Sequence, residues 1–123
     1  MKTAQQYKDS LRERNIRVYV KGQLLDPAEV IDHPFIRGHV NSAAMTYALA
    51  NNSEYADLMT VKSHLTGNTI NRFTHIHQSV EDLMQKAVML RTISQKTGTC
   101  YQRCVGFDAM NATYTVKIGR AHV

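Results

Sequence analysis

Two cysteines, Cys100 and Cys104, are the residues whose type and spacing most directly suggest chemistry. Positions i and i+4 share one face of a helix, with Cβ atoms about 5–6 Å apart. Two thiolates on one face suit zinc, copper(I) or an iron–sulfur centre, although zinc and ferredoxin sites more often use Cys-x-x-Cys. Spacing alone favours a second interpretation, in which both cysteines are buried, unliganded small hydrophobes. A disulfide fits poorly within a regular helix.

A metal site built on this pair needs further ligands. A tetrahedral site or a cubane cluster takes about four, and the chain has two cysteines. Among the histidines, His75 and His77 fall in an expected loop and His33 in a turn, where surface or loop-packing roles are typical. His39 and His64 show no partner pattern. The missing ligands are therefore expected from a histidine, another chain or further sequence.

Composition and motif searches exclude several other classes. The sequence contains no phosphate loop, no dinucleotide-binding glycine fingerprint and no Gly-x-Ser-x-Gly. The 15 basic and 10 acidic side chains give a net charge of +5 without clusters, so we expect no nucleic-acid partner. No apolar run approaches the ~20 residues of a membrane span, and the first residues lack a signal peptide. We expect a cytoplasmic protein whose cysteines are thiols or metal ligands.

The elements that must position these residues are mostly helical. Thr3 and Gln6 form a capping box for a helix over residues 4–14. Further helices are expected over 40–50, 53–59 and 100–112, with a hairpin over 17–25 around Gly22 and a short turn over 26–33. Residues 61–77 read as polar and irregular.

The strongest predicted helix begins at Ser79 and runs to about Gln95. Its helical periodicity predicts a core-facing apolar stripe of Val80, Leu83, Met84, Ala87, Val88 and Leu90. The methionines are expected to fill the core, namely Met45, Met59, Met84, Met89 and Met110.

The sequence thus predicts a mainly α fold with one small β-hairpin, in a partial domain over residues 1–116. The last helix has no stop signal, so we expect a segment of a longer protein. Residues 117–123 resemble the translation of a common sequencing adapter, and we expect them to be non-native.

Several stretches together resemble the 4-hydroxybutyryl-CoA dehydratase family, over nearly everything from Met1 to about Thr113. The resemblance is most specific at Cys100-Tyr-Gln-Arg-Cys104-Val-Gly. The wider group includes the flavin-dependent 4-hydroxyphenylacetate 3-hydroxylases. The resemblance implies that this chain forms the N-terminal helical region of an acyl-CoA-dehydrogenase-like fold. The other matching stretches are residues 3–12, 17–22, 32–37, 44–47, 55–60, 69–73 and 95–97.

The resemblance also implies a function. Cys100 and Cys104 would be two ligands of a [4Fe–4S] cluster, completed by a third cysteine and a histidine further along the chain. With FAD, such an enzyme dehydrates 4-hydroxybutyryl-CoA to crotonyl-CoA and isomerises vinylacetyl-CoA by a radical mechanism, as a homotetramer. The catalytic residues and most flavin contacts would lie outside this segment, which is expected to be inactive alone. Alternatives are a 4-hydroxyphenylacetate 3-monooxygenase-type flavoenzyme without a cluster and a non-catalytic helical interaction module.

Overall fold

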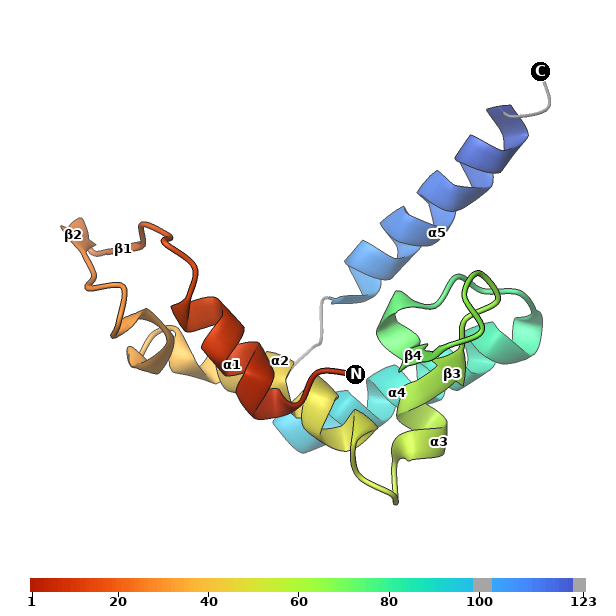
Figure 1. Cartoon of the computed structure of the whole chain (residues 1–123), viewed down its shortest axis with the longest axis horizontal. Coiled ribbons are helices and arrows are strands. Elements are labelled where there is room, and N and C mark those ends of the chain that lie inside the picture. Colours follow the sequence, from red (N-terminus) through yellow and green to blue (C-terminus); the bar gives the residue numbers. More distant parts are fainter. Residues whose placement is uncertain (99–102, 121–123) are drawn as a thin grey trace.

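The computed structural model describes the backbone of residues 1–98 and 103–120, and their side chains except those of 103–105, 107, 108 and 117–120. The fold is mainly helical, as predicted (Figure 1). The α-helices are α1 (Ala4–Arg12), α2 (Arg37–Ala50), α3 (Ala56–Met59), α4 (Val80–Thr97) and α5 (Arg103–Arg120). Two 3-10 turns, η1 (Val30–Asp32) and η2 (Arg72–Thr74), accompany the strands β1 (Tyr19–Val20), β2 (Gln23–Leu24), β3 (Thr60–Lys62) and β4 (Thr69–Asn71).

Local signals set several helix boundaries where the sequence places them. The Thr3 hydroxyl accepts from the Gln6 amide, and the Gln6 side chain accepts in return from the Thr3 amide, which completes the capping box of α1. Ser79 caps α4 by accepting from the backbone of Asp82. Gly98 ends that helix in the left-handed region, with φ of 65°. The two predicted caps are confirmed. The ends of α1, α2, α3 and α4 differ from expectation by up to three residues, whereas α5 continues eight residues beyond its expected end at residue 112.

The core lies where α2, α3, η2 and α4 meet. Its buried members are Leu49, Ala50, Met59, Phe73, Met89 and Ile93, with Met45, Tyr55, Leu58, Leu90 and Met110 packed against them. Met59 and Met89 are 0% exposed, which confirms the methionine-filled core at these positions. Met84 is 60% exposed, so the prediction is wrong there.

The predicted core stripe of α4 is confirmed only at Leu90, which packs against the core, and it is wrong at the other positions, including the exposed Ala87. Val80, Leu83, Met84 and Val88 are all at least half exposed. The buried face instead carries Lys86, Met89 and Ile93. Periodicity fails because a lysine occupies the inner face, where its Nζ donates to the buried carbonyl of His75 at 2.8 Å. A buried ammonium with such a partner is tolerated in a core that pattern reading reserves for apolar residues.

The structure has two antiparallel hairpins, and only the first was predicted. In the first, Tyr19 pairs with Leu24 and Val20 with Gln23, around a turn at Lys21 and Gly22 with positive φ. The second pairs β3 with β4, with Val61 opposite Ile70. Its sequence was interpreted as irregular because polar strands carry no apolar alternation.

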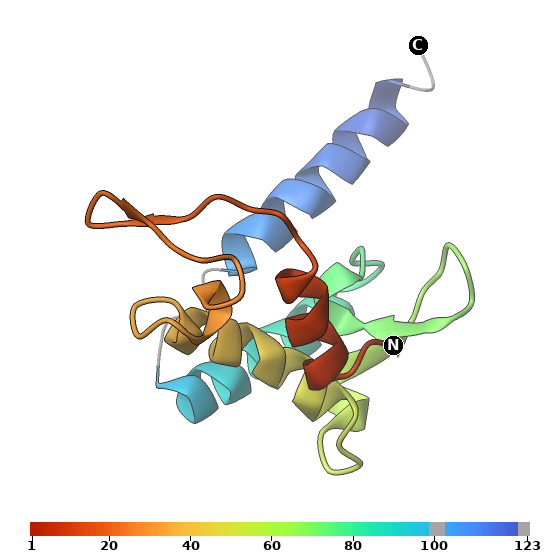
Figure 2. The same cartoon turned by 60° about the vertical axis from the view of Figure 1, so that its left-hand side comes forward.

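The last helix projects from the body of the molecule. Figures 1 and 2 both show α5 rising away from the other helices toward its C-terminal end. Its described part is Arg103–Arg120, which includes residues 117–120 of the expected non-native segment. The expected start at residue 100 lies outside the described residues. Within the described part of the chain, no helix has the length and apolar character needed to cross a membrane.

Candidate functional site

One of the two candidate cysteines, Cys104, lies near the beginning of α5. Cys100 lies outside the described residues, and Cys104 is the second residue of α5, of which the backbone is described. The structure therefore places one of the two candidate ligand positions on a helix, as the sequence predicted. The surroundings of this helix then decide how that position is held.

Three contacts hold the middle of α5 against the rest of the chain. Met110 packs against the core cluster. The side-chain Oδ1 of Asn111 accepts a hydrogen bond from the backbone amide of His77, at 2.8 Å. The hydroxyl of Tyr114 lies 3.4 Å from Nε2 of His64, and their rings meet edge to face. His64 thus has a partner, which the sequence did not indicate.

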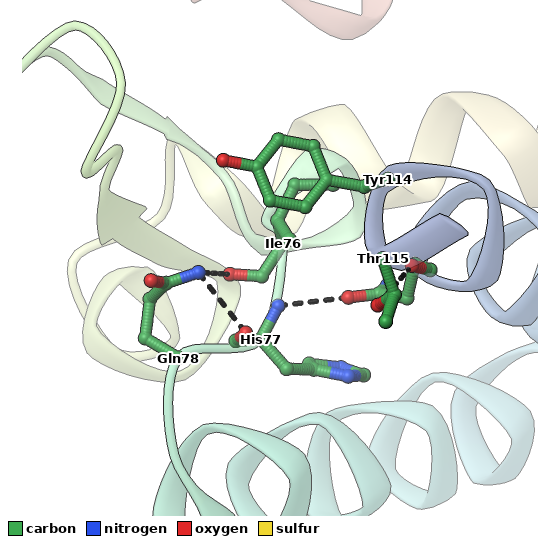
Figure 3. Close-up of a pocket in the computed structure, with 6 residues that line it drawn as sticks. Ile76, His77, Gln78, Tyr114 and Thr115 are labelled. Carbon is green, nitrogen blue, oxygen red and sulfur yellow. Dashed lines mark hydrogen bonds between the residues drawn. The ribbon is translucent and has the colours of Figure 1, made fainter. Parts of the chain in front are cut away.

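A cavity of about 380 Å³ lies between α5 and the loop of residues 75–78. Figure 3 shows Ile76, His77 and Gln78 on the loop side of this cavity and Tyr114 and Thr115 on the helix side. Gln78 folds back, its Nε2 donating to the carbonyls of Ile76 and His77. Polar groups on the wall are thus used to fix the loop and the helix. The lining residues are Ile76, His77, Gln78, Asn111, Tyr114 and Thr115.

The loop of residues 75–78 is fixed from below by the first turns of α4. One carboxylate oxygen of Asp82 accepts from the Gln78 amide at 2.9 Å and lies 3.0 Å from Nε2 of His75. Burial acts to raise the pKa of Asp82, but the hydrogen bonds from Gln78 and His75 and the charges of His75 and Arg72 outweigh it. The pKa of Asp82 therefore lies below its usual range. Asp82 thus acts as an ionised acceptor at neutral pH.

Two buried cations complete this network. Lys86 is 2% exposed and donates to the carbonyl of His75. Arg72 is 7% exposed, and its guanidinium donates to the carbonyls of Asp57, Leu58 and Thr60. Burial lowers the pKa of Arg72, and the carboxylate of Asp82, 3.9 Å away, opposes that effect. Both cations bind backbone oxygens, so their role here is to fix chain segments in place.

The described residues do not complete a metal site. No group of three or more His, Cys, Asp or Glu side chains in that part of the chain is arranged to hold a metal ion. The chemistry of the two cysteines suits a thiolate-ligated iron centre. His75 is buried against Asp82 and His33 accepts from the Phe35 amide, so both have the packing roles that the sequence predicted.

Sequence reasoning missed most of the polar network. Arg72 and Lys86 were not predicted as functional residues, because single basic side chains are usually exposed to solvent. The contact of Asn111 with His77 shows that this side of α5 meets other parts of the protein. No signal in the sequence marks Lys86 as an inner residue, because the apolar periodicity of its helix points to another face.

Known proteins similar to this chain are about four times its length. It is 53% identical over 113 residues to 4-hydroxybutyryl-CoA dehydratase/vinylacetyl-CoA-Δ-isomerase of Clostridium aminobutyricum, which covers 92% of this chain and 23% of the relative. An archaeal 4-hydroxybutyryl-CoA dehydratase from N. maritimus, described as oxygen tolerant, has a solved structure. It matches with a TM-score of 0.84 and 44% identity, over 98% of this chain and 24% of that one.

A more distant structure shares the fold. The oxygenase component of 4-hydroxyphenylacetate 3-monooxygenase, complexed with FAD and 4-hydroxyphenylacetate, matches 78% of this chain and 19% of its own, with a TM-score of 0.65 and 22% identity. The sequence profile described as 4-hydroxyphenylacetate 3-hydroxylase N terminal matches residues 3–121. Because that match spans nearly the whole sequence, the chain belongs to the 4-hydroxyphenylacetate 3-hydroxylase family and corresponds to its N-terminal region.

Proposed function

We propose that this chain is the N-terminal segment of an FAD- and [4Fe–4S]-dependent enzyme that dehydrates 4-hydroxybutyryl-CoA to crotonyl-CoA and isomerises vinylacetyl-CoA. The observation that carries the proposal is the 53% identity to the Clostridium aminobutyricum enzyme along 92% of this chain. Such identity over one segment supports a shared activity for the complete proteins. The monooxygenase likeness, at 22% identity, supports the fold alone.

Within this proposal, Cys100 and Cys104 supply two thiolate ligands of the cluster. Thiolates are the usual ligands of iron–sulfur clusters, and Cys104 lies in the first turn of a helix that three contacts hold against the body. When bound, the flavin and the cluster supply the one-electron and Lewis-acid chemistry that loss of an unactivated hydrogen requires. The segment's own part is to hold two ligand positions.

The remaining attributes of the complete protein follow from the same proposal. Its partner is an acyl-CoA substrate, and it assembles as a homotetramer. The other cluster ligands, the catalytic base and most flavin contacts belong to the three quarters of the relative's length that this chain does not span. The segment alone is therefore inactive. Cysteines that bind iron as thiolates also favour a reducing compartment, which places the protein in the cytoplasm.

A chimera tests the proposal, with this chain replacing the matching segment of the Clostridium aminobutyricum enzyme. Purified without oxygen, it should be brown, with about four iron atoms per chain. Cys100→Ser and Cys104→Ser should each lose most of the iron. Ala112→Ser, at an exposed position of the same helix, should retain it. A yellow, iron-free chimera that hydroxylates 4-hydroxyphenylacetate would remove the dehydratase assignment in favour of a monooxygenase.

A further inference from the structure

We infer that Asn111 is a positioning residue that sets the rotation of α5 about its axis and its position along that axis, and thereby the place of Cys104. The contact that does this joins the Asn111 side chain to the backbone of residues 75–78. The role of Cys104 as an iron ligand rests on the proposed function. The anchoring of α5 itself rests on geometry alone.

The anchoring contact is short and partly buried. Asn111 Oδ1 accepts from the backbone amide of His77 at 2.8 Å. A hydrogen bond from a backbone amide of the loop to a side-chain oxygen of the helix restricts the helix both along its axis and about it. The Tyr114–His64 contact, at 3.4 Å, is weaker by its length. Packing of Met110 against the core resists separation but tolerates sliding.

The loop side of this contact, residues 75–78, is itself held in place by hydrogen bonds to α4. Lys86 Nζ donates to the carbonyl of His75 at 2.8 Å, and the Gln78 amide donates to Asp82 at 2.9 Å. The amide of His77 lies between these two fixed points. Both Lys86 and Asp82 project from α4, whose inner face is part of the core. Residues 75–78 therefore connect α4 to α5, so the position of α5 depends on that of α4.

Helix geometry carries this restraint to the cysteine. Cys104 and Asn111 are seven residues apart in α5, which is almost two turns at 3.6 residues per turn. Their Cα atoms therefore lie at nearly the same angle about the axis, roughly 10 Å apart along it. A slip of one residue at Asn111 would turn Cys104 by about 100° and shift it by about 1.5 Å. Metal ligands tolerate errors of only about 0.2 Å in distance.

The chain offers substitutions that separate anchoring from mere stability. Asn111→Ala removes the acceptor, whereas Asn111→Asp keeps an oxygen at the same reach. Asn41→Ala is the matched control, because Asn41 is an exposed asparagine inside another helix, α2. All three are made in the full-length chimera with the Clostridium aminobutyricum enzyme, so that the segment is studied in a complete chain.

Two measurements follow each variant. Hydrogen exchange of peptides covering residues 75–78 and 103–106 should rise about two- to tenfold in Asn111→Ala, since one hydrogen bond is lost. Loss of iron to a chelator should become roughly tenfold faster, with a changed electron paramagnetic resonance spectrum of the reduced protein. Asn111→Asp should restore both readouts, and Asn41→Ala should leave both unchanged.

The outcomes are distinguishable from failure of the proposed function. If Asn111→Ala retains iron and spectrum like the parent chimera, Asn111 does not position the ligand, whatever the exchange data show. If the parent chimera holds no iron, the cluster proposal fails, and exchange alone then decides. Faster exchange at 103–106 would still support the anchor, and unchanged exchange would overturn it.

Discussion

The two hairpins of this chain are held in opposite ways. The first, β1–β2, depends on its own turn: Gly22 has φ of 81°, and Tyr19 and Leu24 are 61% and 55% exposed. The second, β3–β4, leads directly into η2, in which Arg72 and Phe73 are buried. Figure 1 shows the first hairpin standing out at one end and the second lying against α3 and α4.

The difference lies in where the stabilising contacts come from. An isolated two-stranded hairpin is marginal in water. Besides its own turn, β1–β2 has a contact of Lys21 Nζ with the exposed ring of Phe35, 5.3 Å from its centroid. The guanidinium of Arg72 binds the carbonyls of Asp57, Leu58 and Thr60, which join the end of α3 to the start of β3. One buried side chain therefore organises the second hairpin from outside it. A polar sequence can form a well-held element when a tertiary partner satisfies its backbone.

Removal of Arg72 should have the largest effect, because the second hairpin would lose the side chain that supports it. In Arg72→Met, three carbonyls in partly buried hydrogen bonds lose their donor and Asp82 loses a nearby charge. We expect a loss of about 3 kcal/mol or more in the free energy of unfolding, measured by urea denaturation. Arg12→Met, at an exposed pair with Asp9, is the control and should cost under about 1 kcal/mol. Equal costs for the two variants would mean that Arg72 does not organise the second hairpin.

Lys86→Met tests the next support of the same region. Methionine fills the space of the lysine stem but leaves the carbonyl of His75 without its ammonium donor. We expect a cost of about 1–2 kcal/mol and faster hydrogen exchange over residues 75–78. Exchange in β1–β2 should not change, because that hairpin receives nothing from Lys86. A more stable Lys86→Met protein would show that burial of the charge outweighs its hydrogen bond.

Matched glycine substitutions in the two hairpin turns test the same difference between β1–β2 and β3–β4. Gly67 and Gly22 have similar φ values, 70° and 81°, and neither would bring a new Cβ against another atom. Alanine in this conformation costs about 1 kcal/mol. Gly67→Ala should reduce global stability by that amount, since β3–β4 is tied to the core. Gly22→Ala should reduce it by less than about 0.5 kcal/mol, because β1–β2 can open locally. Equal thermal midpoints for the two variants would argue against this difference.

The smallest expected effect is a response to acid. The pKa of Asp82 is lowered in the folded state, so its contribution is present above the ordinary carboxyl pKa and is lost as pH falls through the lowered value. Acid should therefore loosen residues 75–78 first. Exchange corrected for its intrinsic pH dependence should rise there and stay constant in β1–β2. Asp82→Asn should abolish the difference between neutral and acidic samples.

Local chemistry explains what could be predicted from the sequence. The caps at Thr3 and Ser79 and the Gly22 turn are each fixed by a few neighbouring residues, and each is where we expected it. The apolar face of α4 was assigned incorrectly because periodicity cannot recognise Lys86 as an inner residue. The second hairpin was missed because its support, Arg72, acts across 12 to 15 residues.

The candidate site likewise combines residues that the sequence identifies and a contact that the sequence could not predict. The cysteine spacing and the family resemblance led to Cys100 and Cys104 directly from the sequence. The partner of Asn111 could not be predicted, because it is a backbone amide in a loop whose position depends on Asp82 and Lys86.

The helix α5 is mechanically a lever with its pivot near Asn111. Its 18 residues extend for about 27 Å, and the contacts with the body that its described side chains make include those of Met110, Asn111 and Tyr114. A tilt of about 10° at the pivot would move the Cys104 end by roughly 2 Å over its arm of about 10 Å. A small shift of residues 75–78 would therefore displace Cys104. A partner that binds the C-terminal end of α5 and tilts the helix would displace Cys104 as well.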